Sequence, residues 1–355
     1  MHRLGGLVGT LLVLLSACAS AAPAAPPPSS VAPGSAQSKP GSSAQTSGSP
    51  ATSAGAATKL IGVFTSLAGN QTPFWLAMDG GSFRQHGLEV SASLLQGSPA
   101  MASLFSGEIQ FAEGAAGEIL SAAAENSDLA YLSTIDPYFD FVLVAPNSII
   151  TAADLKGKKL GIAPPGGTVW VATRMVLKRV GVDPDKDVTQ ISMGVTQQRA
   201  VALQSGAIDA SLLDIITGRK VVQAGGFHIL YDLATQKVPY STGTAVRKSW
   251  LANNHDVMQR FTDALIEGIS RYKQDGTAAM ASYKKYTKTD SDAEAQQMYD
   301  YYNPILLSQP FPKTQDFSET AQVMADVNPK VSSVDLNALV DPSFVQNAVD
   351  RGLAK

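Results

Sequence analysis

Few of the side chains that most often perform chemistry occur in this sequence. It has one cysteine, Cys18, and four histidines, His2, His86, His228 and His255, no two of which have the spacing of metal ligands. The glycine-rich signatures of nucleotide-binding loops and the Gly-x-Ser-x-Gly signature of serine hydrolases are absent. We therefore expect no metal, no cofactor and no enzymatic activity, although acids and tyrosines alone suffice for some reactions.

A second group of residues suits binding rather than catalysis. Small hydroxyl, amide and glycine residues recur just after segments with the pattern of β-strands, where free backbone N–H groups attract partial or full negative charge. Taken singly, each Ser-Pro, Thr-Pro or Gly-Gly pair is ordinary helix capping. Taken together at one edge of a sheet, they predict a ligand-binding site. The candidates are Ser66, Asn70, Thr72, Gly97, Ser98, Gly114, Gly166, Gly167 and Thr168.

The same loops contain acids but no lysine or arginine. Glu113 ends a predicted strand and Asp214 directly follows another, whereas sites for sulfonate or phosphate often use arginine. The sequence therefore favours a small-molecule ligand that is neutral, zwitterionic or aromatic, or that carries a cationic group, over a strong anion. Four aromatic side chains near these loops suit stacking on a flat ligand, and each suits a place in the core equally. They are Trp75, Tyr138, Trp170 and Tyr240.

Alternating strands and helices must position these residues. In the first half of the chain the predicted strands are 59–66, 88–96, 109–113, 129–135 and 139–145. In the second half they are 159–163, 187–193, 207–213, 228–233 and 243–248. Helices are predicted between them, the first from Thr72 to Gly87 with a break at Gly80 and Gly81. This alternation predicts an α/β protein with parallel or mixed sheets.

Two runs of the alternation predict two α/β lobes joined by a hinge, with a ligand cleft between them. We expect lobe I to consist of residues 59–147 and 243–355, and lobe II of residues 148–242. The mostly helical segment after Asn254 would return to lobe I. The length of 355 residues suits two lobes, and the net charge of −3 does not suit nucleic-acid binding. We expect a monomer that binds no nucleic acid.

The N-terminus has the pattern of an export signal. Met1, His2 and Arg3 precede an apolar run from Leu4 to Leu15, which is too short to span a bilayer. The following Leu15-Ser16-Ala17-Cys18 resembles the bacterial lipobox, in which the cysteine is diacylated and becomes the first residue of the mature protein. Of the forty residues 19–58, 33 are Ala, Pro, Ser or Gly, a composition that predicts a disordered tether. The alternative is a buried cysteine in a short helix.

Several segments, in order, resemble bacterial solute-binding proteins of the nitrate, sulfonate, taurine and thiamine-pyrimidine-precursor group, the NMT1/THI5-like family. They are TPFWLAMDGGSFRQHGLEV (72–90), SLFSGEIQFAE (103–113), ITAADLKGKKLGI (150–162), GVDPDKDVT (181–189), ALQSGAIDASLLD (202–214) and AGGFHILYDL (224–233). Two places depart from the family pattern, namely the paired prolines in APPGGTVW and the acid at Asp214.

The resemblance implies a type II periplasmic-binding-protein fold whose two lobes close on a ligand. It also implies delivery of that ligand to the permease of an ABC importer, with the site in the loops at 65–73, 97–99, 113–115 and 166–168. With the lipobox, it implies a protein anchored by lipid on the outer face of a cell membrane. The alternatives are an enzyme or a sensory or surface-binding domain on the same fold.

Overall fold

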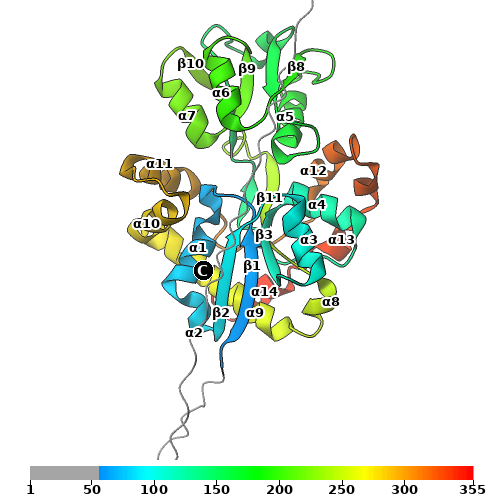
Figure 1. The fold of residues 1–355 in the computed structure, drawn as a ribbon, viewed down its shortest axis with the longest axis vertical. Coiled ribbons are helices and arrows are strands. Elements are labelled where there is room, and N and C mark those ends of the chain that lie inside the picture. Colours follow the sequence, from blue (N-terminus) through cyan, green and yellow to red (C-terminus); the bar gives the residue numbers. More distant parts are fainter. Residues whose placement is uncertain (1–55, 355) are drawn as a thin grey trace, which may run out of the picture. The chain divides into compact units, whose positions relative to one another are not determined.

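The computed structural model describes residues 56–354, which contain two β-sheets surrounded by helices (Figure 1). Cys18 and residues 19–55 of the expected tether lie outside the described residues. Within residues 56–354, no helix is both long enough and apolar enough to cross a membrane.

The first sheet has the strand order β2-β1-β3-β11-β4, and β5 also pairs with β11. Its strands are β1 (Thr58–Phe64), β2 (Leu88–Leu94), β3 (Phe111–Ala115), β4 (Ala130–Tyr131), β5 (Asp136–Tyr138) and β11 (Pro239–Val246). Strands β1, β2 and β3 are parallel to one another, whereas β11 is antiparallel to β3, β4 and β5. Because β1 lies between two parallel neighbours under helices on both faces, apolar residues occupy both of its sides.

The second sheet has the order β10-β6-β9-β7-β8. Its strands are β6 (Phe141–Pro146), β7 (Lys159–Ile162), β8 (Thr189–Ser192), β9 (Ala210–Asp214) and β10 (Phe227–Asp232). Strands β7, β8 and β9 run parallel, and β6 is antiparallel to both β9 and β10. We call each sheet with its covering helices a lobe, the first and the second.

The second lobe carries α5 (Thr168–Arg179), α6 (Thr196–Gln204), α7 (Ile215–Gln223) and the 3-10 helix η2 (Ala152–Leu155). The first lobe carries helices from both ends of the described chain. They are η1 (Gly69–Gln71), α1 (Thr72–Gly80), α2 (Ser82–Gln85), α3 (Ser98–Ser106), α4 (Ala116–Glu125), α8 (Lys248–Leu251), α9 (His255–Gln274), α10 (Gly276–Thr287), α11 (Asp292–Tyr302), α12 (Gln315–Ala325), η3 (Pro329–Ser333), α13 (Leu336–Leu339) and α14 (Ser343–Asp350).

The chain crosses between the sheets twice, once from β5 to β6 and once from β10 to β11. The expected lobe boundaries at 147/148 and 242/243 differ from these crossings. The expected boundary places β6 in lobe I, but β6 pairs with β9 and β10 of the second sheet. Strand β11 begins at Pro239, four residues before the expected start. The first crossing therefore lies at residues 139–140 and the second at residues 233–238.

Helices cover both faces of the first sheet because alternate residues of β3 point to opposite sides. Phe111 packs with Phe74 of α1 and Phe261 of α9, whereas the next residue, Ala112, lies in the core formed with α3 and α4. Helices α1 and α9 approach closely, since a Cβ atom at Gly268 would lie 2.6 Å from the Ala77 Cβ. The break expected near Gly81 is confirmed, because Gly81 has φ of 85° between α1 and α2.

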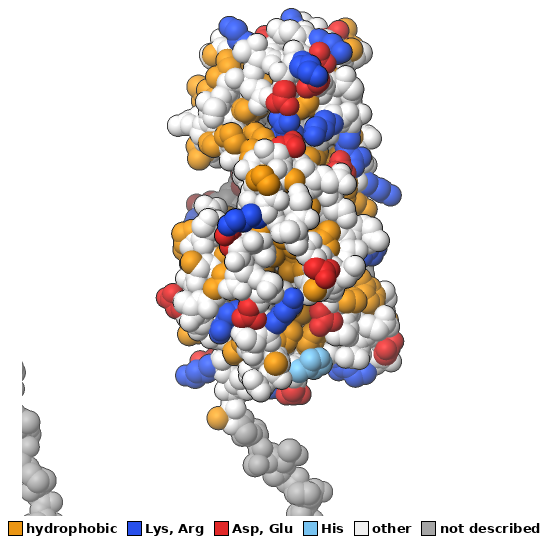
Figure 2. All heavy atoms as spheres, turned by 90° about the vertical axis from the view of Figure 1, so that its right-hand side faces the viewer, with side chains coloured by type: hydrophobic (Ala, Val, Ile, Leu, Met, Phe, Trp, Pro, Cys, Tyr) orange, Lys and Arg blue, Asp and Glu red, His pale blue; other side chains and the backbone are white. Residues whose placement is uncertain are grey.

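Charged side chains of both signs are interspersed on the face that carries α3, α4 and α12, and no continuous patch of one sign covers that face (Figure 2). Several of these charges form ion pairs, such as Arg179 with Glu319 at 2.5 Å and Lys330 with Glu125 at 2.7 Å. The first of these pairs joins α5 of the second lobe to α12 of the first. Because exposed ion pairs stabilise little, apolar burial must supply most of the stability.

Candidate functional site

Three strand-end loops of the first lobe converge on the carboxyl group of Glu118 in α4. The backbone N–H of Gly97, after β2, donates to Glu118 Oε1 at 3.2 Å. The Thr65 hydroxyl after β1 and the Ala115 N–H at the end of β3 lie close enough to lower the pKa of this group. Since β1, β2 and β3 are parallel, their carboxyl ends meet at one edge, where open α/β sheets bind ligands.

Burial has a larger effect on Glu118 than these donors have. It raises the pKa of Glu118 above the ordinary value of 4.5, because a carboxylate loses hydration when water is excluded. The Oε2 atom of Glu118 is buried and has no hydrogen-bond partner among the described residues. The Glu118 carboxyl group therefore keeps one buried acceptor atom, and the Thr65 hydroxyl near the group is not hydrogen-bonded to that atom in this arrangement.

A cavity of about 510 Å³ lies beside Glu118. Its walls are one face of α3 with Gly97, one face of α4, the segment Gly166–Thr168 at the start of α5, and Asn328. Residues of both lobes therefore line it. The volume suits a small organic molecule, and apolar side chains such as Met101 and Phe105 provide much of one wall.

Tyr240, in β11, links the two lobes next to this cavity. Its hydroxyl lies 3.0 Å from Thr168 Oγ1 of the second lobe and accepts from the Gly117 N–H of the first lobe at 3.5 Å. Its ring stacks on Phe139 in the other crossing segment, with the ring centroids 3.9 Å apart. Burial raises the pKa of Tyr240, so the hydroxyl stays protonated. The first crossing thus packs against the start of β11, directly after the second crossing.

The first crossing also holds a pair of acids, Asp136 and Asp140. Asp136 is buried and accepts hydrogen bonds from Asn70 Nδ2 at 3.1 Å and from the Tyr138 N–H at 3.2 Å. Asp140 is half-buried and accepts from the hydroxyl of Tyr302. Burial raises the pKa of both acids, and the neighbouring Asp140 carboxylate raises that of Asp136 further.

The structure brings one group of the predicted site residues together at the large cavity. Five residues line it, namely Gly97, Ser98, Gly166, Gly167 and Thr168. Gly114 and Tyr240 adjoin it, since a Cβ at Gly114 would lie 3.7 Å from Glu118 Oε2 and Tyr240 contacts Thr168. Ser66 is half-buried at the end of β1.

A second group of predicted residues lies on the other face of the first sheet or at the crossing. Asn70 binds Asp136, and the half-buried Tyr138 lies in β5 and pairs with Pro239. Glu113 is fully buried and accepts from the Thr244 hydroxyl at 2.5 Å. None of these three lines the 510 Å³ cavity. Glu113 faces away from the cavity, although its neighbour Gly114 adjoins it, because successive residues of a strand alternate between the faces of a sheet.

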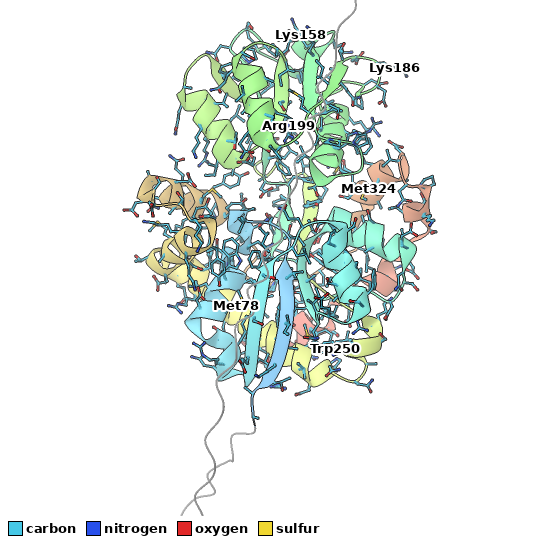
Figure 3. The ribbon with its side chains drawn as sticks, viewed as in Figure 1. Met78, Lys158, Lys186, Arg199, Trp250 and Met324 are labelled. Atoms are coloured by element: carbon cyan, nitrogen blue, oxygen red, sulfur yellow. The ribbon has the colours of Figure 1, made fainter. Side chains whose placement is uncertain are left out.

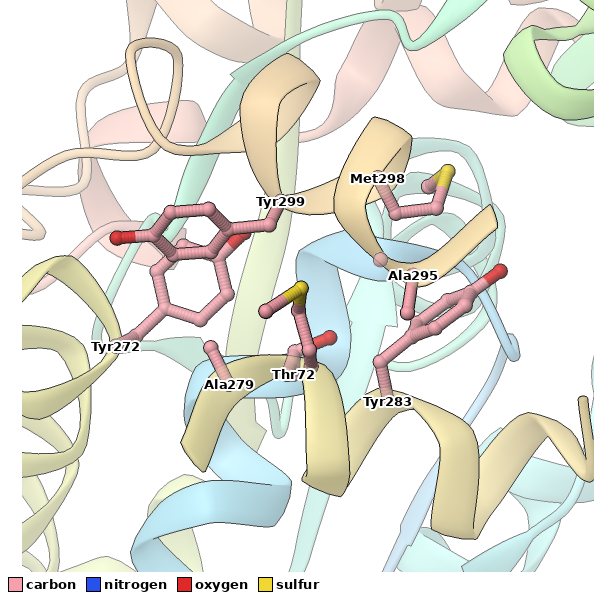
Figure 4. A pocket seen from close by; sticks show the side chains of 9 residues that line it. Thr72, Tyr272, Ala279, Tyr283, Ala295, Met298 and Tyr299 are labelled. Atoms are coloured by element: carbon pink, nitrogen blue, oxygen red, sulfur yellow. The ribbon is translucent and has the colours of Figure 1, made fainter. Parts of the chain in front are cut away.

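Thr72 lines a much smaller cavity, of about 10 Å³, between α1, α10 and α11. Tyr272, Tyr283 and Met298 surround the same space (Figure 4). The volume holds about one water molecule, so this space does not suit an organic ligand. Thr72 serves the packing of the helical segment against α1.

Trp75 lies in the core rather than at the cavity. Its side chain has no exposed surface, and its ring stacks on Tyr286 with centroids 4.6 Å apart and 11° between the planes. Phe64 packs edge-on against it at 5.5 Å. The sequence allows this tryptophan either to stack on a ligand or to lie in the core. It lies in the core because α1 is buried between the first sheet and α10.

Asp214 caps a helix in the second lobe. Its carboxylate accepts from the Thr217 N–H at 2.9 Å and from the Thr217 hydroxyl at 2.8 Å, at the start of α7. Arg199 of α6, labelled in Figure 3, is buried nearby, and its guanidinium donates to the carbonyl oxygens of Gly194 and Leu212. The Arg199 guanidinium is therefore already hydrogen-bonded to backbone carbonyl groups of the second lobe.

Sequence reasoning missed several residues of the site. Glu118 lies on a helix five residues after the predicted loop acid Glu113, and its only signal is that it follows Gly117. Asp136 and Asp140 flank the aromatic residues Tyr138 and Phe139 in a segment without a clear period. A run of Asp-Pro-Tyr-Phe-Asp between two predicted strands is the signal that could have pointed to the crossing.

Comparisons with known proteins place this geometry in context. A family model described as NMT1/THI5 like matches residues 68–279, more than half of the chain. No curated protein sequence matches the chain.

Solved structures of low sequence identity share the fold. The periplasmic sulfonate-binding protein SsuA of a sulfonate ABC transporter from Methylobacillus flagellatus KT is 17% identical with a TM-score of 0.68, over 84% of this chain and 95% of that one. The periplasmic aliphatic sulphonate binding protein SsuA from Escherichia coli is 17% identical with a TM-score of 0.65, over 78% and 94%. The desulfurization enzyme DSZB is 15% identical with a TM-score of 0.62, over 82% and 99%. The chain therefore has the two-lobe fold of periplasmic binding proteins.

Proposed function

Because the chain belongs to the NMT1/THI5-like family, we propose that it is an extracytoplasmic solute-binding protein that captures a small organic molecule between its lobes. In this proposal it then delivers the molecule to the permease of an ABC importer. The observation that carries the proposal is the 510 Å³ cavity, whose walls come from Gly97 and α4 of one lobe and Gly166–Thr168 of the other. A ligand there touches both lobes at once.

Contact with both lobes gives a mechanism for signalling occupancy. A ligand that binds both walls stabilises the closed arrangement by its differential affinity for that arrangement. In the described chain two crossing segments join the sheets, and Phe139 of the first stacks on Tyr240, which lies just after the second. Rotation about these segments would change the distance between Gly97 and Thr168 while leaving each sheet intact. The permease would then recognise the closed form.

The fold alone does not separate binding from catalysis, because the desulfurization enzyme DSZB shares it. Family membership and the likeness to binding proteins favour binding. The cavity supports the same function, since the polar part of its walls consists of glycines, hydroxyl groups, Asn328 and two glutamates, Glu118 and Glu125, without a histidine, cysteine or lysine.

The solute-binding proposal is tested by a thermal-shift screen of the purified chain against sulfonates, nitrate, pyrimidines, flavins, aromatic acids and amines. We expect at least one class to raise the Tm, and the rise should increase with concentration as mass action requires. Small-angle X-ray scattering should show a smaller radius of gyration with the same solute. A Tm that no solute raises would contradict solute capture.

We further propose that Cys18 is acylated and that the chain from residue 19 to the start of β1 at Thr58 tethers the folded part to the membrane surface. The order of charge, apolar run, small residues and cysteine supports this. Replacing Cys18 by serine should abolish the mass increase of acylation and should release the chain from the membrane fraction, because acyl chains supply the anchor. Intact-mass spectrometry and fractionation check this. A Cys18→Ser chain that stays membrane-bound would contradict the lipid anchor.

A further inference from the structure

The charges around the 510 Å³ cavity are unusual for a site that takes an anion. Two acids line it, Glu118 and Glu125, and no lysine or arginine does. Glu125 is exposed and its charge is balanced by Lys330 at 2.7 Å. Glu118 has no ion-pair partner among residues 56–354, although its carboxyl group is far less exposed to solvent. The cavity therefore contains one uncompensated carboxyl group.

Glu118 occupies the position in which an anionic ligand would be favoured. The N-termini of α3 and α5 both begin at the cavity, at Ser98 and Thr168, and neither has a side-chain cap. Helix N-termini attract anions through free N–H groups. Here the Gly97 N–H before α3 already donates to Glu118 Oε1 at 3.2 Å. The chain's own carboxylate thus takes the place of a ligand anion.

We propose that Glu118 determines which ligands the cavity accepts: an organic molecule with a protonated or hydrogen-donating nitrogen group and an apolar body, and not a sulfonate. This inference rests on the proposed function and names its ligand class. The Oε2 atom of Glu118, buried and without a partner among the described residues, is the acceptor for the nitrogen group. A sulfonate at the same place would lie against a carboxylate with no cation to offset it.

The rest of the cavity suits the same ligand class. Met101 and Phe105 of α3 offer an apolar wall for the body of the molecule. The Tyr240 hydroxyl lies 3.0 Å from Thr168 Oγ1 of the opposite wall and adds a neutral hydrogen-bonding group beside the cavity. The two buried arginines of the second lobe both bind protein groups. Arg199 donates to the carbonyl oxygens of Gly194 and Leu212, and Arg174 pairs with Asp185 and Asp326.

The experiment compares probes that differ only in the charge of their head group. Benzylamine, benzyl alcohol and phenylmethanesulfonate form one series, and butylamine, butanol and butanesulfonate form another. Affinities for the purified wild-type chain are measured by isothermal titration calorimetry up to millimolar concentration. We expect each amine to bind about tenfold more tightly than its alcohol and its sulfonate, because a charge-assisted hydrogen bond is roughly twice as strong as a neutral one.

Three variants assign the preference to one residue. Glu118→Gln keeps the shape and removes the charge, and should remove the preference for amines by weakening their binding about tenfold. Glu118→Asp keeps the charge and should retain part of the preference. Glu89→Gln makes the same change at an exposed position in β2 that does not line the cavity, and should leave affinities within about twofold.

Each outcome decides the inference. Wild-type chain that binds the sulfonates as tightly as the amines overturns it, and leaves solute capture standing. An amine preference that persists in Glu118→Gln overturns the role of Glu118. Absence of binding by all six probes contradicts the inference, and contradicts the proposed function as well only if the wider solute screen also finds nothing. The wild-type comparison decides the ligand class even if Glu118→Gln does not fold.

Discussion

Replacement of Trp75 by alanine is expected to lower the free energy of unfolding by about 3–5 kcal/mol, the cost of removing a large buried aromatic side chain. Trp75 has no exposed surface, and it packs between Phe64 and the ring of Tyr286. Its removal would leave a cavity between α1, the first sheet and α10, and these elements are held by many other contacts that prevent collapse into the space.

Urea denaturation followed by circular dichroism measures this effect. Trp75→Phe is the matched control, because it keeps an aromatic ring at the stacking position and should cost less than the alanine variant. Neither variant should change solute affinity under conditions where it is folded, since Trp75 does not line the 510 Å³ cavity. Near-normal stability together with lost solute binding would contradict the placement of Trp75 in the core and make it a ligand contact.

The regular part of the fold could be predicted from the sequence because its signals are local. Ser98-Pro99 marks the start of α3 and Gly107 marks its end, and both follow from capping and backbone preferences. Gly81 marks the break between α1 and α2 for the same reason. Strand β6 was recognised as a buried apolar segment, but such a segment carries no information about which of two sheets it joins.

The polar residues of β5 and of the start of β11, beside the two crossings, are harder to assign to strands from the sequence. Strand β5 contains Pro137, and β11 begins Pro-Tyr-Ser-Thr-Gly, a composition typical of loops. The structure buries these residues with hydrogen-bond partners for the hydroxyl groups of Tyr240, Ser241 and Thr244. Ser241 Oγ, for example, lies 2.8 Å from both Tyr131 OH and Thr134 Oγ1. A hydrophobic pattern cannot detect a strand whose buried side chains are polar and mutually hydrogen-bonded.

The sequence indicated the position of the candidate site but not its charge. Glycines and hydroxyl residues after the strands indicated its place, and five of them line the cavity. Its charge required the three-dimensional structure, because Glu118 lies inside a predicted helix and becomes important only where three loops converge on it. Spacing along the chain also cannot separate Glu113 from Glu118, although one faces the interior and the other faces the cavity.

The stability of the folded chain is expected to fall as the pH rises from about 4.5 to above 7, and Glu113 should be a main cause. Burial raises the pKa of Glu113 from 4.5 to about 7, and the hydrogen bond from Thr244 opposes this rise only in part. Its Oε2 atom has no partner among the described residues. Within this pH range Glu113 keeps its proton in the folded chain and has lost it in the unfolded chain. Because the folded state binds more protons, the free energy of unfolding falls as the pH rises.

Glu113→Gln should remove this contribution. At pH 8 the variant should be more stable than the wild-type chain by about 3 kcal/mol, the free energy that corresponds to the raised pKa. At pH 5, where Glu113 is protonated in the folded state, the two chains should differ little. Buried Asp136, whose pKa is also raised by burial and by Asp140, adds a decline of the same sign in both chains.

The difference between the two chains isolates Glu113 from the other acids. Acids such as Asp185, whose pKa the Arg174 guanidinium lowers, act in the opposite direction and at lower pH, and they are identical in both chains. Urea midpoints at pH 5, 6, 7 and 8 measure the difference, with Glu125→Gln as an exposed-acid control. Parallel pH profiles for wild type and Glu113→Gln would contradict a buried, protonated Glu113. A difference that grows with pH would show that the first sheet holds a neutral acid in its centre.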